Sequence, residues 1–136
     1  FQDLRLAPPL VAGARAMRVV AVAGRYLDPG EAGAEYVEHL RRADLSVGTY
    51  SLRAGATDLQ SPHAEDEVYV VTIGRGQFSS GGQTVEVGPG SVIFVPAHQP
   101  HFFHDVANDL AALVFFGPAY GSRDSGGAVE DESSKG

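Results

Sequence analysis

Residues 55–74, GATDLQSPHAEDEVYVVTIG, place a histidine and three carboxylates at the start of an apolar run. Residues two apart on a strand point to the same face, so Glu67, Tyr69 and Val71 share one side of this run. A carboxylate on the buried side of a strand is unfavourable unless a cation or a hydrogen-bond donor compensates its charge. The stretch therefore predicts a buried strand that begins at a polar or metal-binding group.

A second histidine, His101, also stands at the start of an apolar segment, directly after VPAHQP at residues 95–100. His63 and Glu67 have the spacing to join it if the fold brings the two segments together. Two imidazoles and one carboxylate suit Fe(II), Mn(II), Ni(II), Cu(II) or Zn(II) and leave coordination positions open for a substrate. The residue types therefore indicate a candidate metal site, in which Glu65 or Glu67 would be the carboxylate because both share a face with His63 if the strand begins by residue 63.

The composition favours one all-β domain. The chain has 136 residues, of which 43% are apolar, enough for a single core, and its 17 glycines and eight prolines favour many tight turns. A formal net charge of −7 argues against nucleic-acid binding. No apolar run approaches the roughly 18 residues of a membrane span. Without cysteine or a signal peptide, a disulfide framework and a thiolate metal site are excluded and a cytoplasmic location is expected.

Most of the chain reads as short apolar segments between glycine turns, which indicates eight or nine strands in a sandwich or barrel. Before these segments we expect a strand over residues 17–24 and a short helix over 34–43, where Tyr36, Val37 and Leu40 have helical spacing. The expected division is an N-terminal arm at 1–16, a barrel at 17–120 and a flexible Gly/Ser/acidic tail at 121–136. The later strands are expected at 45–53, 67–74, 91–96, 101–106 and 110–117, with a hairpin at 76–88 around Gly81 and Gly82.

The spacing of these residues resembles the two sequence motifs of the cupins. The first motif is Gly, five residues, His, one residue, His, three or four residues, Glu, six residues, Gly; its positions here are Gly55, Ser61, His63, Glu67 and Gly74. The second is Gly, five residues, Pro, one residue, Gly, two residues, His, three residues, Asn; its positions here are Gly90, Pro96, His98, His101 and Asp105. The resemblance covers about residues 45–117 and implies a double-stranded β-helix, the cupin or jelly-roll barrel.

The resemblance also implies that His63, Glu67 and His101 hold one divalent metal ion per chain, with Fe(II) favoured over Mn, Ni, Cu or Zn. This chain departs from the family at the first histidine, where it has Ser61. The amide oxygen of Gln60, the hydroxyl of Ser61 or a water molecule remain alternatives for that position. In the second motif, His98 replaces a glycine and Asp105 an asparagine.

These features point to an enzyme that acts on a small organic molecule, with a mononuclear non-haem dioxygenase as the first hypothesis. A metal-dependent isomerase or lyase without redox chemistry is the alternative, and a non-catalytic ligand-binding barrel is another. Tyr50 and Tyr69 are candidates to position a substrate, although both equally suit the core. Glu65 is a candidate base only if it turns inward, because Glu65 and Asp66 together suggest a solvated loop edge.

The remaining histidines and aromatic residues have simpler interpretations. His98 fits a turn or the rim of the binding pocket, His104 the face opposite His101, and His39 the surface of the expected helix. A homodimer is expected, formed by exchange of the first strand or by stacking of sheets. Six aromatic residues are expected to fill the barrel: Tyr50, Tyr69, Phe78, Phe94, Phe103 and Phe115.

Overall fold

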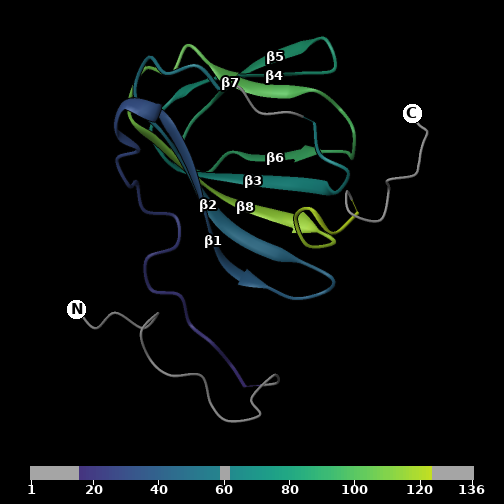
Figure 1. Cartoon of the computed structure of the whole chain (residues 1–136). Coiled ribbons are helices and arrows are strands. Elements are labelled where there is room, and N and C mark those ends of the chain that lie inside the picture. The colour runs from purple at the N-terminus through teal and green to yellow at the C-terminus, as the bar shows by residue number, and fades with distance from the viewer. Residues whose placement is uncertain (1–15, 59–61, 124–136) are drawn as a thin grey trace.

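The computed structural model describes residues 16–58 and 62–123 (Figure 1). Eight strands and one short 3-10 helix, η3 (Gly30–Ala32), are present in these ranges. Within them, no helix has the length and apolar character needed to cross a bilayer. The strands are β1 (Ala34–Arg41), β2 (Ser46–Leu52), β3 (Asp66–Ile73), β4 (Gly76–Ser80), β5 (Gln83–Val87), β6 (Val92–Val95), β7 (His101–His104) and β8 (Leu110–Gly117).

The strands form two antiparallel sheets that face each other. The larger sheet has the order β1-β2-β8-β3-β6, and the smaller has the order β5-β4-β7. Figure 1 shows the smaller sheet as one layer above the larger, with the interior between them. This is the all-β jelly-roll architecture that the motif spacing predicts.

The interior is filled by the alternate residues of each strand. On β3, Tyr69 and Val71 are buried on the same face as Glu67, as the alternation predicts. Three aromatic rings meet between the sheets: the Phe103 ring lies 5.0 Å from Tyr69 and 4.8 Å from Phe78, both in edge contacts. Such pairs add about 1 kcal/mol each to the gain from burial. They close the barrel directly beside His101.

The hairpin at Gly81 and Gly82 forms as expected, between β4 and β5. Both glycines have positive φ, 58° and 80°, which is the backbone that a two-residue hairpin turn requires. Both turn positions are glycine, with no Asn or Asp, so the pairing register of β4 with β5 depends on this glycine pair.

The helix expected over residues 34–43 is wrong, because this segment is the edge strand β1. The pairing of β1 with β2 shifts between Glu38 and Leu40, which marks a β-bulge. A bulge adds one residue and reverses the alternation of faces, so apolar residues on both sides of it acquire a spacing that imitates a helix. His39 lies at this bulge and not on the surface of a helix. Its Nε2 is 2.7 Å from the Thr49 hydroxyl.

The strand expected over residues 17–24 is also wrong. Residues 17–20 have no regular structure and residues 21–24 form a turn. The backbone of this segment pairs with side chains of the larger sheet: the Gly24 amide donates to the Thr49 hydroxyl at 2.8 Å, and the Thr72 hydroxyl donates to the Gly24 carbonyl at 2.6 Å. Apolar composition alone does not reveal that side-chain hydroxyls replace a partner strand here.

The prediction that Phe94 and Phe115 fill the barrel is wrong. Phe94 is 61% exposed and Phe115 is 38% exposed, whereas the neighbouring Val95 and Phe116 are buried. Both positions belong to apolar runs in which either parity looks equally suitable for the interior. The outer face of the larger sheet therefore carries aromatic side chains.

Candidate metal centre

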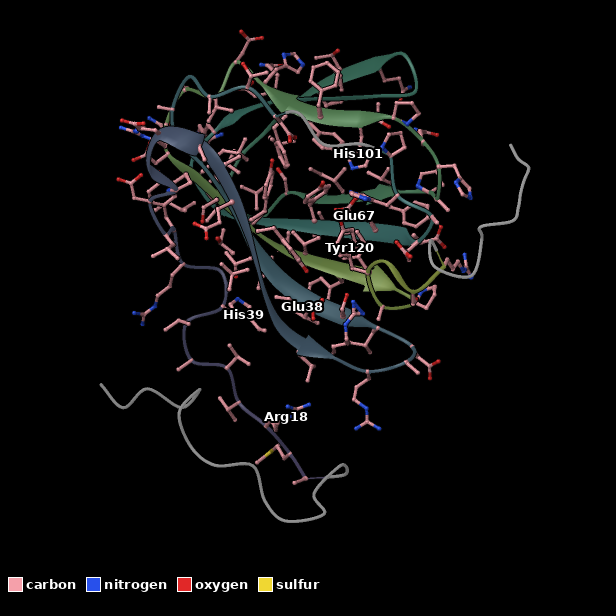
Figure 2. All side chains as sticks on the ribbon, in the orientation of Figure 1. Arg18, Glu38, His39, Glu67, His101 and Tyr120 are labelled. Atoms are coloured by element: carbon pink, nitrogen blue, oxygen red, sulfur yellow. The ribbon has the colours of Figure 1, made fainter. Side chains whose placement is uncertain are left out.

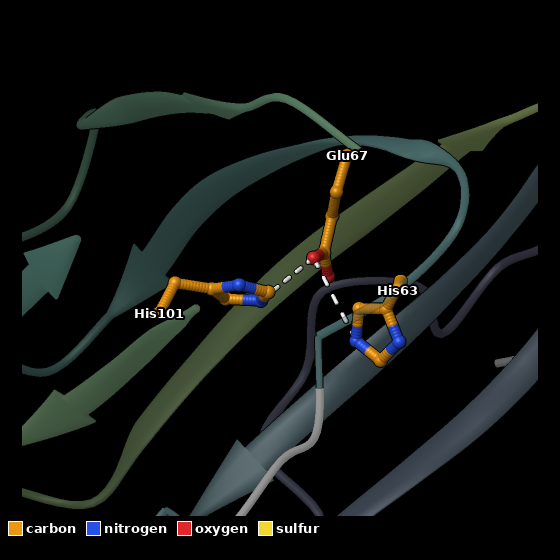
Figure 3. Close-up of side chains that lie close together, drawn as sticks. All are labelled: His63, Glu67 and His101. Carbon is orange, nitrogen blue, oxygen red and sulfur yellow. Dashed lines mark ion pairs between the residues drawn. The ribbon is translucent and has the colours of Figure 1, made fainter. Parts of the chain in front are cut away.

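Three side chains from two distant stretches of the chain point toward one another (Figure 3). His63 precedes β3, Glu67 is the second residue of β3, and His101 is the first residue of β7 in the other sheet. Each offers a ligand atom, and these atoms lie within 4.8 Å of one another. The structure thus brings together the three residues that the sequence predicts as metal ligands.

The three side chains are shielded from solvent to different degrees. Nε2 of His101 is 2.9 Å from Oε1 of Glu67, and both side chains are almost fully buried, at 1% and 2% exposure. Nε2 of His63 is 3.8 Å from the same oxygen and its side chain is 10% exposed. Of the three candidate ligands, His63 is therefore the one nearest the solvent.

The polar atoms at the centre of this group have no hydrogen-bond partners among the described residues. These atoms are both carboxylate oxygens of Glu67 and Nε2 of His101. A buried carboxylate without a donor is unfavourable, whereas a divalent cation between the three groups would satisfy all of them. The residues present therefore fit a metal ion.

The tautomer of His101 supports the same conclusion. Its Nδ1 is 2.8 Å from the Gln99 carbonyl oxygen, which can only accept, so Nδ1 carries the proton and donates it. When the ring is neutral, the lone pair of Nε2 faces the Glu67 carboxylate at 2.9 Å, an electron-rich contact that a cation bound by both groups would relieve. A backbone carbonyl that orients a histidine in this way is typical of metal-binding imidazoles.

Burial by itself would lower the pKa of the His101 imidazole. The Glu67 carboxylate and the Gln99 carbonyl oppose this effect, and the net result is a pKa above the ordinary value. The surroundings of Glu67 and His101 thus favour a positive charge, supplied either by a proton on His101 or by a cation.

Contacts of both its backbone and its ring hold His63 in position. The His98 amide donates to the His63 carbonyl at 2.6 Å, which ties the loop before β3 to the turn before β7. The His63 ring makes edge contacts with Phe116 at 5.2 Å and with Tyr120 at 5.3 Å. His98 itself has a φ of 70°, the left-handed backbone for which glycine is usual, so it occupies the glycine position of the motif in a glycine conformation. Its exposed side chain agrees with the predicted turn role.

His104 lies on the same strand as His101 but faces away from the centre. Its two ring nitrogens contact the Ser79 hydroxyl at 2.7 Å and the Asp105 carboxylate at 2.7 Å. Asp105 has a φ of 48°, a conformation that asparagine and aspartate tolerate better than most residues. A satisfied histidine on the opposite face is what the parity of β7 predicts.

The two tyrosines predicted near the centre are both in the core. The Tyr50 hydroxyl donates to Oδ1 of Asp58 at 2.5 Å, and Oδ2 of Asp58 accepts from the Phe103 amide at 2.8 Å. Tyr50 thus takes part in a buried link between β2 and β7. Tyr69 is fully buried and its ring is 5.9 Å from the His101 ring, in an edge contact that limits the movement of this imidazole.

The prediction that Glu65 lies at a solvated loop edge is wrong, because this residue is only 1% exposed. Its Oε2 accepts from the Arg123 amide at 3.0 Å, while its Oε1 has no hydrogen-bond partner among the described residues. The segment after β8 folds back over this loop, which the sequence does not indicate. Asp66 is exposed as expected and accepts from the Ala97 amide at 2.9 Å. Gln60 and Ser61 lie outside the described residues.

Three aromatic residues that sequence reasoning did not assign to the site surround it: Tyr36, Phe116 and Tyr120. The Tyr120 ring lies 5.3 Å from the His63 ring, and Figure 2 shows His39 apart from Glu67 and His101 on β1. Tyr120 belongs to the segment after β8, where its amide donates to the Ser46 hydroxyl at 2.9 Å. Tyr36 could have been found by reading residues 34–41 as a bulged strand, since it then faces inward.

Comparison with known proteins gives one family. A family model described as Cupin domain matches residues 48–116. An uncharacterized protein of Streptomyces coelicolor is 49% identical over 83 residues, which are 61% of this chain and 79% of that protein.

Solved structures share the fold at low identity. The DMSP lyase DddQ of Ruegeria pomeroyi DSS-3 superposes with a TM-score of 0.60 at 20% identity, over 74% of this chain and 54% of that one. A variant of salicylate 1,2-dioxygenase from Pseudoaminobacter salicylatoxidans gives a TM-score of 0.58 at 18% identity, over 64% of this chain and 27% of that one. The chain thus spans about half of the lyase and a quarter of the dioxygenase.

Proposed function

The chain belongs to the cupin family, and from this membership we propose that it is a mononuclear metal-dependent enzyme acting on a small organic molecule. The observation that carries the proposal is the convergence of His63, Glu67 and His101 on a buried centre without hydrogen-bond partners for Glu67 among the described residues. These three residues would hold one divalent ion. The identity of the fourth ligand stays a prediction, with Gln60, Ser61 and water as the alternatives.

The first candidate reaction is oxygenation by a dioxygenase with Fe(II). Two histidines and one carboxylate form the ligand set of non-haem iron oxygenases, and an Fe(II) ion in it supplies open positions for a substrate oxygen and for O2. The protein would contribute an enclosed, aromatic surrounding that excludes bulk water. Tyr69 would hold the His101 ring through its edge contact, and Tyr50 would act through its link to Asp58. Glu65 is buried as a base would need to be, but its contact with the Arg123 amide supports a structural role better.

Oxygen uptake tests this proposal. Protein reconstituted anaerobically with Fe(II) is mixed with O2 and, in turn, with a diketone, a catechol or a thiol, and oxygen is followed with an electrode. We expect consumption with one of these classes and none in the His101→Ala variant. Turnover without oxygen would contradict the oxygenase assignment. It would favour a lyase or isomerase reaction, in which the metal polarises a carbonyl group of the substrate. Tight substrate binding with no turnover would instead indicate a binding protein.

The proposed homodimer would use the outer face of the larger sheet. Phe94, Val68 and Phe115 lie in one register row across β6, β3 and β8, and Phe94 and Phe115 are substantially exposed. A contiguous apolar row that extends onto the edge strand β6 is typical of an interaction surface. Sheet stacking is therefore the better supported route, since residues 17–24 offer no strand to exchange.

Phe94→Glu is expected to convert a dimer into a monomer, because it places a charge on the most exposed aromatic residue of the apolar row. Light scattering after gel filtration would then give half of the wild-type mass. Val85→Glu is the matched control, since Val85 is comparably exposed on β5 of the other sheet, and it should leave the mass unchanged. A monomeric wild-type protein, or a dimer that survives Phe94→Glu, would contradict this surface.

A further inference from the structure

Tyr36 carries a buried hydroxyl that has no hydrogen-bond partner among the described residues. Buried polar groups in folded proteins are almost always paired, so an unpaired phenol is an exception that requires an explanation. Near the proposed metal centre, the natural explanation is a hydrogen-bond partner that arrives with a ligand.

The backbone places Tyr36 on the inner face of the barrel. It pairs in register with Tyr50, whose side chain is buried in the core, and directly opposite residues of adjacent strands share a face. Its ring leans over Gly48, where a Cβ would lie within 2.5 Å of ring atom Cε1. Any larger residue at position 48 would displace the phenol, so the glycine provides the space that the ring occupies.

The Tyr36 ring is connected to the metal centre through Phe116. It makes an edge contact with Phe116 at 6.0 Å, and Phe116 in turn makes an edge contact with His63 at 5.2 Å. Phe116 also pairs in register with Glu67 across β8 and β3. The phenol therefore belongs to the aromatic wall around the three proposed ligands.

The surroundings of Tyr36 keep its hydroxyl protonated. Burial raises the pKa of this phenol most, and the negative charges of Glu38 and Glu67 raise it further. A protonated phenol is a hydrogen-bond donor at neutral pH. The hydroxyl of Tyr50, by contrast, already donates to Asp58.

We propose that Tyr36 is a substrate-binding residue, whose hydroxyl donates a hydrogen bond to an oxygen of a ligand bound at the centre formed by His63, Glu67 and His101. This inference rests on the proposed metal site. It predicts a substrate with at least two oxygen atoms, one for the cation and one for the phenol, as in a catechol, a hydroxy acid or an oxo acid. A ligand that binds the metal through a single nitrogen would not use Tyr36.

The test compares Tyr36→Phe with wild type, both loaded with Co(II), in titrations with 4-nitrocatechol followed by absorbance. We expect the variant to bind 4-nitrocatechol about tenfold more weakly, as for loss of one hydrogen bond, and to bind imidazole as wild type does. Tyr36→Phe should melt no lower than wild type, because it removes a hydroxyl without a partner. Tyr26→Phe is the matched control, since Tyr26 lies beside Val37 and Ser51 on the outer face of the larger sheet, and it should change neither affinity.

The outcomes separate this inference from the proposed function. If wild type binds no Co(II), the metal site itself is wrong. If both proteins bind one Co(II) and have the same affinity for 4-nitrocatechol, the metal site stands and the role of Tyr36 is wrong. A visible phenolate band in the Fe(III)-loaded wild type that Tyr36→Phe abolishes would make Tyr36 a metal ligand, and would likewise overturn the donor role.

Discussion

The His101→Ala variant is expected to lose stoichiometric metal binding, with an affinity at least about 100-fold below that of wild type. Substitutions that only disturb the surroundings of a ligand already lower metal affinity by about 10- to 100-fold, and this one removes an almost fully buried donor atom. It also leaves the Glu67 carboxylate with one neighbouring imidazole in place of two. Elemental analysis of protein purified without added metal, followed by titration with Co(II), measures the loss.

His104→Ala is the control for this prediction, because it removes an imidazole from the same strand that faces away from the centre. It should retain the metal content of wild type. His63→Ala should also bind metal weakly, although its more exposed position leaves room for water to replace the ring. Wild-type metal content in both His63→Ala and His101→Ala would show that the centre is assigned wrongly.

Gly74→Ala is expected to lower the free energy of unfolding by about 4 kcal/mol, or to prevent folding. Gly74 has a φ of 87°, and a Cβ there would overlap the Asp109 carbonyl oxygen and lie 2.6 Å from Cα of Leu110. These atoms belong to the backbone at the start of β8, so they cannot move aside without displacing the strand. Urea denaturation followed by circular dichroism measures the change.

Gly82→Ala separates the two causes of this loss. Gly82 has a similar φ of 80°, but no atom lies within 4 Å of the position that a Cβ would take. Gly82→Ala should therefore lower the free energy of unfolding only by the cost of placing a Cβ-bearing residue at positive φ, about 1 kcal/mol. Equal losses in the two variants would mean that the close approach of β8 to Gly74 contributes nothing.

The spacing of the two motifs predicted the most about this molecule. It anticipated a two-sheet barrel and the meeting of His63 and Glu67 with His101, and the alternation along β3 anticipated that Glu67, Tyr69 and Val71 share the interior face. These features are predictable because period-two alternation and fixed motif spacing reflect the backbone geometry of strands directly.

Other features depend on contacts between distant segments and could not be read locally. The bulge at His39 reverses the parity of β1, which concealed the inward position of Tyr36. Glu65 is buried by the return of residues near Arg123, and nothing within the loop itself indicates this cover. Phe115 and Phe116 are adjacent and equally apolar, so only the pairing of β8 determines which one is inside.

The positions of the proposed ligands on two different sheets have a mechanical consequence. Glu67 belongs to the five-stranded layer and His101 to the three-stranded one, and these strands are not neighbours in either sheet. A cation held by both residues would cross-link the two sheets. Loss of the ion would make local separation of the two sheets easier. The lifetime of the bound ion and the protection of the β7 amides from hydrogen exchange should therefore increase or decrease together.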